Sequence, residues 1–245
     1  MSMNESDALE AYLHSCDIRQ RQLRASKATD IWLRRVAKHA VSPRLRGTAR
    51  VVVTIAFAQI EKKKVRAILT SSPVWLHLGC GGEHKAGWTN IDLVGDPVDL
   101  AWNLASPLPF PDSSADAIFH EHLLEHLPLA AGAALLEECY RLLKPGGTLR
   151  IGVPDAGALI AAYRHHDDAY LVALHPGCPT RMLAVQELFY WHRHCTMFDE
   201  ETLAFVFRAA GFPQPRVKQF GDSALSPAPD TPRRRLETLY MEATK

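Results

Sequence analysis

The fold is decided by the stretch Val74-Trp75-Leu76-His77-Leu78-Gly79-Cys80-Gly81-Gly82. Its valine, tryptophan and leucine residues favour a short buried strand. The glycines that follow let the backbone turn sharply and approach a ligand closely, because they carry no Cβ atom. A second short strand, Thr89 to Leu93, brings Asp92 to its end, where a carboxylate can accept hydrogen bonds from both hydroxyls of a ribose.

Length and composition predict one α/β domain with additions. The chain has 245 residues, of which 47% are hydrophobic, and this is enough for a packed core. Its 28 basic and 27 acidic residues give a formal net charge of +1. Such a balance argues against nucleic acid as the main partner, and a small-molecule substrate is expected instead.

Cysteine usage and hydropathy indicate a cytoplasmic protein. The five cysteines are odd in number and scattered, without the paired spacing of a zinc site, so we expect reduced thiols. The N-terminus lacks the pattern of a signal peptide. The longest apolar run, residues 51–58, is far too short to span a membrane.

Alternating strand and helix patterns predict an α/β fold with an open, mostly parallel, Rossmann-like sheet and flanking helices. The predicted strands are seven: 74–78, 89–93, 98–100, 115–120, 148–153, 216–220 and 236–241. We expect a helical N-terminal extension over residues 1–70 and a main domain over 71–245. A helical insertion, which is a candidate lid, is expected over 156–196, before the last strands.

The first two connections between parallel strands are unusually short. Only eight residues separate Gly82 from Ile91, whereas a parallel crossover normally needs a dozen or more, usually helical. One face of the sheet would therefore be poorly covered by its own connections. We expect residues 43–69 to cover it.

Four further motifs follow the glycine-rich stretch in order: Asn90 to Asp92, Leu108 to Asp112, Asp116 to Leu127, and Leu142 to Gly147. Together, over about residues 74–220, they resemble the class I S-adenosylmethionine-dependent methyltransferases, in particular a small bacterial branch with the methyltransferase type 11 domain. This branch is often linked to surface-sugar or polysaccharide pathways.

The resemblance implies S-adenosylmethionine as cofactor and assigns residues to it. The loop of Gly79, Cys80 and Gly81 would lie under the methionine part, beside His77, which stands where the family often has an acid. The ribose hydroxyls would be held by Asp92. The adenine would be held by Asn103 and Leu104, and His120 would border the methyl-transfer site.

The reaction expected from the resemblance is methyl transfer to a small polar acceptor, such as a sugar or a surface-polysaccharide precursor. A hydroxyl acceptor would need a general base, because its proton must leave as the bond forms. The candidates, in order, are His120, then Glu121, then His192 or His194.

Three alternatives differ in the features they require. The sequence His122-Leu123-Leu124-Glu125-His126 matches the pattern of inverted zinc peptidases, but Pro128 would strain one helix through it, and we expect no metal. A dinucleotide-dependent dehydrogenase would have a third glycine at His84 and its acid about twenty residues after Gly79. The loss of an acid at His77 leaves open a non-catalytic partner protein of the same fold.

Overall fold

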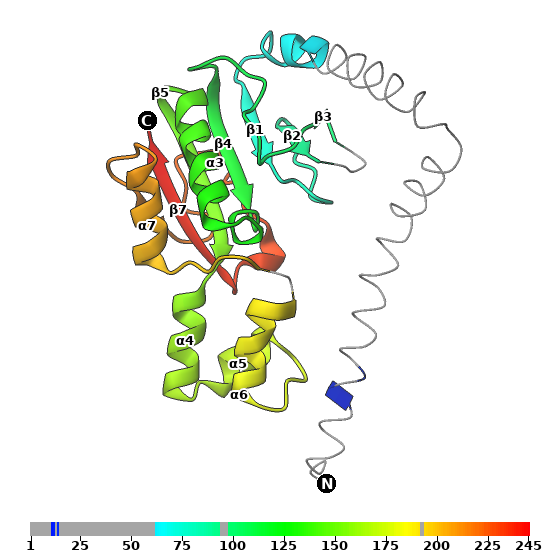
Figure 1. The fold of residues 1–245 in the computed structure, drawn as a ribbon, viewed down its shortest axis with the longest axis vertical. Helices are drawn as coiled ribbons and strands as arrows, with labels where there is room; N and C mark the ends of the chain where they lie inside the picture. The colour runs from blue at the N-terminus through cyan, green and yellow to red at the C-terminus, as the bar shows by residue number, and fades with distance from the viewer. Residues whose placement is uncertain (1–10, 13, 15–61, 94–97, 192–193) are drawn as a thin grey trace, which may run out of the picture.

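A seven-stranded sheet forms the centre of the described part of the chain, in the order β3-β2-β1-β4-β5-β7-β6 (Figure 1). The computed structural model describes residues 11, 12, 14, 62–93, 98–191 and 194–245. Strands β1 to β5 are parallel, and β7 is antiparallel to both β5 and β6. The predicted open, mostly parallel Rossmann-like sheet is thereby confirmed. The strands are β1 (Trp75–Leu78), β2 (Thr89–Asp92), β3 (Leu100–Ala101), β4 (Ala115–Glu121), β5 (Leu143–Pro154), β6 (Arg216–Lys218) and β7 (Thr238–Thr244).

Several strand boundaries differ from the prediction; β7, for example, spans Thr238–Thr244 instead of 236–241. Strand β3 begins at Leu100 instead of Val98, and the Asp99 carboxylate accepts a hydrogen bond from the Asn90 amide at 2.7 Å. A side chain therefore takes the place of a regular ladder bond before β3. Strand β5 begins five residues earlier than predicted, at Leu143, because the chain passes directly from the preceding helix into pairing with Ala115.

The helices between the strands begin at side-chain caps where the sequence provides them. The carboxylates of Asp155 and Asp199 accept hydrogen bonds from amides in the first turns of α4 and α7, at 2.8 Å each. The helical elements are η1 (Leu124–His126), α3 (Leu129–Leu142), α4 (Ala156–His165), α5 (Asp168–Leu174), α6 (Arg181–Gln186), η2 (Glu187–Trp191), α7 (Glu200–Ala209) and η3 (Pro232–Arg234).

Helices α3 and α7 cover one face of the sheet, in front of β4, β5 and β7 in Figure 1. Leu136 of α3 and Phe207 of α7 are fully buried against strand residues such as Leu76 and Ile151. Residues 62–68 are helical, and Val65 packs into this same core. This apolar face supplies most of the burial that stabilises the described fold.

The opposite face is covered by the long loop between β6 and β7. Leu225 of this loop packs with Trp88 and Phe119, and Trp75 lies against them. Of the segment 43–69, which we expect to cover a flank of the sheet, Val65 packs into the core on the α3 and α7 side, and residues 43–61 lie outside the described residues.

A buried ion pair holds this loop on the sheet. The Arg150 guanidinium, fully buried on β5, donates to both carboxylate oxygens of Asp230 at 2.6 Å each and to Glu242 at 3.2 Å. It also donates to the backbone carbonyls of Gln219 and Asp222. Burial of this charge is compensated by these partners, so the loop depends on them.

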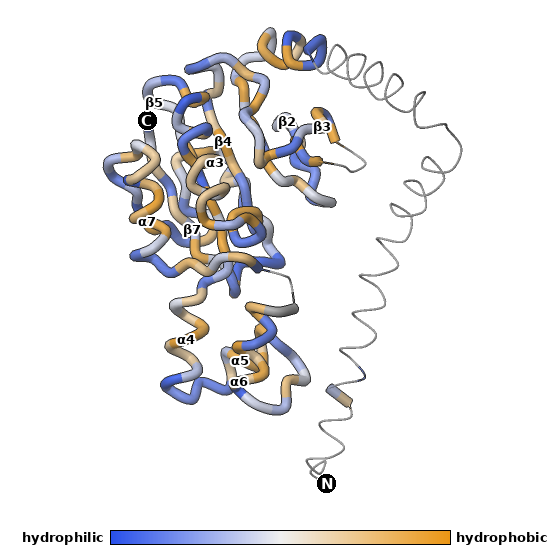
Figure 2. The backbone as a smooth tube through the Cα atoms, in the orientation of Figure 1, coloured by the Kyte–Doolittle hydropathy of each residue, from blue (hydrophilic) through white to orange (hydrophobic). Residues whose placement is uncertain are grey.

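Residues 156–191 build a small helical layer at the end of the sheet where β4 and β5 terminate (Figure 1). Leu159, Leu171 and Leu188 form its own apolar cluster, and Figure 2 shows apolar segments within α4 to α6. In the residues the structure describes, no helix is both long and apolar enough to cross a membrane.

Candidate functional site

The glycine-rich loop turns immediately after β1. Gly79 and Gly81 have φ angles of +65° and +52°, in the left-handed region that suits glycine. The amides of Gly79 and Cys80 both donate to the Ile91 carbonyl, at 2.8 and 3.3 Å. These bonds tie the loop to the end of β2.

The Asp92 carboxylate lies against this loop. One of its oxygens accepts a hydrogen bond from the Gly81 amide at 2.8 Å, and the other accepts from the Leu93 amide at 2.6 Å. Each carboxylate oxygen keeps a second lone pair, so Asp92 can still accept from hydroxyl groups. The loop and the acid, thirteen residues apart in the sequence, form one site.

His77 lies beneath the site and not on its surface. Its imidazole is buried on the face of Phe119, and Nδ1 lies 2.9 Å from the side-chain oxygen of Asn90. Burial lowers the pKa of His77 to about 4. Because side chains alternate across a strand, a residue at this position of β1 points away from the Leu76 and Leu78 face. It is linked to the segment after the loop through Asn90, whose side-chain oxygen also accepts from the Lys85 amide at 2.9 Å.

Cys80 fills space in the loop. Its side chain is buried, and burial raises the pKa of the thiol to about 11. A protonated thiol is a poor nucleophile, so its contribution is packing.

Asn103 and Leu104 follow β3, on the same side of the sheet as Asp92. The Asn103 side chain is exposed, donates to the Ser106 hydroxyl at 3.2 Å and accepts from the Ala105 amide at 3.1 Å. Leu104 is 9% exposed. Trp102, just before them, donates its amide to the Asp92 carbonyl at 2.8 Å, so this turn is held beside the acid.

His120 and Glu121, at the end of β4, are both buried. The His120 imidazole is fully buried, with no hydrogen-bond partner among the described residues, and its burial lowers the pKa to about 3. In this conformation it cannot contact an acceptor. Glu121 points to the other face, where it accepts from the Tyr240 hydroxyl at 2.6 Å and the Thr231 amide at 3.2 Å.

Beyond β4 and β5 lies a pocket of about 340 Å³. Leu159, Leu174 and Leu188 of the helical layer form its apolar side. The polar side comprises His122, His126, Asp155, His175, His194, Arg233, Arg234 and Glu237. Of the predicted general bases, His194 lines this pocket, whereas His192 lies outside the described residues.

Glu125 lies behind this pocket, in the short helix η1, and is 1% exposed. Neither oxygen of its carboxylate has a hydrogen-bond partner among the described residues. Burial raises the pKa of this carboxyl group to about 8. In the sequence, Glu125 is the acid of the zinc-peptidase pattern.

The described residues do not form the continuous helix that the zinc-peptidase pattern requires. The helical residues are only Leu124–His126, and His122 has a φ angle of +53°. His122 and His126 are therefore not one turn apart on a continuous helix. His122 Nε2 instead lies 2.9 Å from the Thr238 hydroxyl.

The glycine-rich loop and the pocket meet through Leu123. A Cβ atom added to Gly79 would stand 2.8 Å from Cδ1 of Leu123, so the two residues pack directly. On the other side, Arg233 lines the pocket and forms an ion pair with Glu83 of the loop. The glycine-rich loop and the pocket are thus linked twice, by Leu123 just after β4 and by Arg233 in the β6–β7 connection.

Residues 76–151, which span the loop, Asp92 and the start of the pocket, match the family model described as "Methyltransferase domain". Over these residues the chain is therefore similar to the methyltransferase domain family, in agreement with the resemblance in its sequence.

The relatives of this methyltransferase domain are distant. A protein of Mycolicibacterium smegmatis, named a probable S-adenosylmethionine-dependent methyltransferase, is 34% identical over 58 residues, which cover 24% of this chain and 22% of that relative. A ubiquinone/menaquinone biosynthesis C-methyltransferase of Desulfotalea psychrophila is 30% identical over 132 residues, 52% of this chain and 51% of that relative. The match thus spans about a fifth and about half of the lengths of these curated relatives.

Among solved structures, a 1,6-didemethyltoxoflavin-N1-methyltransferase of Burkholderia thailandensis is 17% identical, with a TM-score of 0.46. The superposition covers 95% of this chain and 89% of that one. That structure contains 1,6-didemethyltoxoflavin and S-adenosylhomocysteine.

The loop of the methyltransferase domain leaves room for a cofactor. A Cβ atom added to Gly81 or Gly82 would meet no heavy atom within 4 Å among the described residues. The open side of the loop, together with the remaining lone pairs of Asp92, leaves room for a ligand that donates hydroxyl groups. Residues that sequence reasoning missed are Leu123 and Arg233, because their role is a contact between distant segments.

Proposed function

We propose that the chain transfers a methyl group from S-adenosylmethionine to a small polar acceptor. The observation that carries this proposal is the hydrogen bond from the Gly81 amide to the Asp92 carboxylate, which supports a nucleoside-binding role for this acid beside an open glycine loop. Asp92 would accept from the ribose hydroxyls. Asn103 and Leu104 would contact the adenine, and Gly79 to Gly81 would lie under the methionine part.

The acceptor would occupy the pocket beyond β4 and β5. Its volume of about 340 Å³ is near the lower end for small-molecule sites, which suits a ligand of roughly monosaccharide size. Leucines line one side, and imidazole, guanidinium and carboxylate groups line the other. This mixture supports a polar acceptor that bears hydroxyl groups, such as a sugar or a polysaccharide precursor.

When bound, the cofactor supplies a methyl group that is already activated by its sulfonium. The protein therefore has to orient the acceptor, exclude water and accept one proton. Glu237 is the residue proposed to accept that proton. It lines the pocket, and burial raises the pKa of its carboxyl group, which makes it a stronger base than an exposed glutamate.

His120 and Glu121 take positioning roles in this proposal. The Glu121 carboxylate holds Tyr240 and the Thr231 amide, and it thereby fixes the segment that presents Arg233 and Glu237. His120 supports the end of β4 from within the core.

The test is a methyl-transfer assay with isotopically labelled S-adenosylmethionine and a panel of sugars, nucleotide sugars and small amines. We expect S-adenosylhomocysteine and a labelled product to accumulate together with at least one hydroxyl-bearing acceptor. Binding of S-adenosylhomocysteine without turnover on any of them would contradict the acceptor class. Absence of binding in folded protein would contradict the enzyme activity itself and favour a non-catalytic partner.

A further inference from the structure

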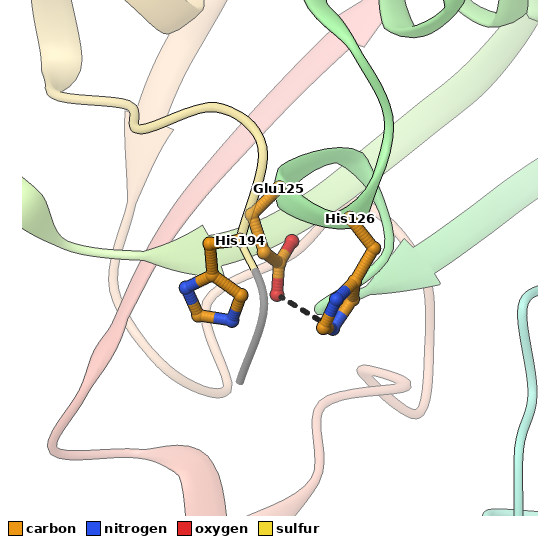
Figure 3. A group of neighbouring side chains, drawn as sticks. All are labelled: Glu125, His126 and His194. Atoms are coloured by element: carbon orange, nitrogen blue, oxygen red, sulfur yellow. Dashed lines mark ion pairs between the residues drawn. The ribbon is translucent and has the colours of Figure 1, made fainter. Parts of the chain in front are cut away.

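Three potential metal ligands converge behind the pocket, from two segments of the chain. Figure 3 shows the carboxylate of Glu125 between the imidazoles of His126 and His194. Each of the three offers one ligand atom, and these atoms all lie within 4.8 Å of one another. The fold brings these residues together, because His194 lies 69 residues after Glu125 in the sequence.

The backbone holds the two segments in place. The amides of Cys195 and Thr196 donate to the Glu125 carbonyl at 2.6 and 3.2 Å. The Thr196 hydroxyl donates to the Leu127 carbonyl at 2.6 Å. The position of His194 relative to Glu125 is therefore fixed by hydrogen bonds that do not involve its own side chain.

The Glu125 carboxylate lacks compensation in the described structure. It is 1% exposed, and neither of its oxygens has a hydrogen-bond partner among the described residues. Its nearest charged-group contacts are His122 Nδ1 at 3.5 Å and His126 Nε2 at 3.9 Å. Buried polar groups are normally paired or coordinate a metal, so an uncompensated carboxylate between two imidazoles points to a cation.

The donor set identifies the class of cation. Two imidazoles and one carboxylate form the ligand set of catalytic zinc sites, which keep a further position open. Imidazole suits zinc, copper, iron and nickel, whereas magnesium and calcium take oxygen ligands. With bonds of about 2.0–2.2 Å, tetrahedral ligand atoms stand roughly 3.4 Å apart. The His126 side chain is 44% exposed, so its rotation can shorten the distance from its ligand atom to the other two.

We propose that Glu125, His126 and His194 bind one divalent transition-metal ion, with Zn²⁺ the preferred metal. His126 and His194 also line the pocket, so the open coordination position would face it. This differs from the peptidase pattern, in which His122 and His126 would hold the ion and Glu125 would be the base. It also replaces the expectation, drawn from the sequence, that the chain binds no metal.

His122 would act on the metal through Glu125. It lies 3.5 Å from the Glu125 carboxylate through Nδ1, and its Nε2 lies 2.9 Å from the Thr238 hydroxyl. Outer partners of this kind orient a ligand and tune its basicity. The left-handed backbone of His122, with a φ angle of +53°, is the kind of strain that accumulates at functional sites.

The site also gives the ion a role, and this step rests on the proposed function. A metal at this position could bind the acceptor oxygen and lower the pKa of its hydroxyl, as it does for bound water. Glu237 would then take the released proton. Metal binding itself needs no cofactor, so it can be tested separately.

The test is a titration of tag-free, chelator-treated full-length protein with Co²⁺, followed by visible absorption, and then with Zn²⁺. We expect one Co²⁺ per chain with the intense bands of a four- or five-coordinate ion, and displacement of Co²⁺ by one equivalent of Zn²⁺. Excess Mg²⁺ should not compete. Absence of a saturable Co²⁺ spectrum, or competition by Mg²⁺, would overturn the proposal.

Variants locate the ion. His122→Gln should lower the affinity for Co²⁺ by about 10- to 100-fold, as expected for an outer partner of a ligand. His194→Ala and Glu125→Gln remove proposed ligands, so each should lower the affinity further. The matched controls are His165→Ala and Glu137→Gln, both at exposed positions outside the lining of the pocket. Circular dichroism shows which variants fold. Unchanged binding in folded His194→Ala would overturn the assignment, as would equal losses in the two controls. S-adenosylhomocysteine titration of the metal-free protein tests the cofactor site independently.

Discussion

Gly79 and Leu123 pack against each other where β1 and β4 end, with 2.8 Å between Cδ1 of Leu123 and the Cβ that Gly79 lacks. This contact joins the proposed cofactor loop to the segment that carries Glu125 and His126. Gly79 is constrained in two ways, because its φ angle of +65° also disfavours any side chain.

Substitution Gly79→Ala should therefore affect both stability and ligand binding. The left-handed backbone costs roughly 1–2 kcal/mol for a residue with a Cβ, and the displaced Leu123 should lower affinity for S-adenosylhomocysteine about tenfold. Gly177→Ala is the matched control, since Gly177 has a φ angle of +87° and open space around it. Urea unfolding and calorimetric titration measure the two effects. If both variants bind equally well, the contact with Leu123 does not shape the loop.

The Arg150–Asp230 pair should be a major source of stability. Asp230→Asn leaves a fully buried guanidinium with its main partner uncharged, which costs on the order of 3–5 kcal/mol when such a pair is broken. The control is Asp222→Asn, whose carboxylate forms an exposed pair with Lys218 and should matter little. Urea unfolding gives both values. Similar small losses in the two variants would show that the loop over Phe119 is held by other contacts.

Protonation of the buried histidines should make stability depend on pH. The pKa of His77 is lowered to about 4 and that of His120 to about 3, so both are neutral in the folded protein and take up protons on unfolding below about pH 6.5. Their contribution is complete above pH 6.5 and is lost as pH falls towards 4, by roughly 3 kcal/mol for His77.

Glu125 acts in the opposite sense. The pKa of its carboxyl group is raised to about 8, so its protonation stabilises the folded state at low pH. This contribution is lost as pH rises from about 4.5 towards 8.

Because the two effects oppose each other, the contribution of His120 is best measured as the difference between the wild type and His120→Leu. Urea unfolding at several pH values should show that the free energy of unfolding falls less steeply below pH 6.5 in the variant. The difference in slope should correspond to at most one proton. Parallel curves would contradict the neutral, buried state of His120.

Replacement of Glu237 should separate catalysis from binding. Glu237→Gln removes the proposed proton acceptor but keeps the shape of the side chain, so turnover should fall by about a hundredfold or more. Affinity for S-adenosylhomocysteine should stay unchanged, because Glu237 lies at the pocket and not at the loop. Steady-state kinetics with the identified acceptor provide the measurement, with Glu137→Gln as control. Unchanged turnover would assign the proton to another group.

The parts of the fold that local sequence patterns determine were predictable. Strands β1 and β4 follow from apolar runs bounded by glycine or polar residues, and α7 follows from Asp199 as its cap. Strand β3 was misplaced by two residues, because Asp99 bonds to the Asn90 amide through its side chain. Such a bond depends on a neighbouring strand and leaves no local signal.

The contact between Asp92 and the glycine loop was predictable to the same extent, because the two lie close in sequence at the ends of consecutive strands. The environment of His77 was not predictable, because its partner Asn90 comes from the next strand. The approach of His194 to Glu125, 69 residues earlier, and the full burial of His120 both depend on how the chain packs in three dimensions. These are tertiary contacts without a sequence period.

The central claim is tested most directly by calorimetric titration of S-adenosylhomocysteine into the metal-free wild type and into Asp92→Asn, with NAD as the comparison ligand. We predict one site per chain in the wild type, affinity about 10- to 100-fold lower in Asp92→Asn from the lost charge-assisted hydrogen bonds, and no binding of NAD. Urea unfolding should show that the variant is folded. Absence of binding in the folded wild type, or equal affinity in Asp92→Asn, would contradict the assignment of the loop and Asp92 as the cofactor site.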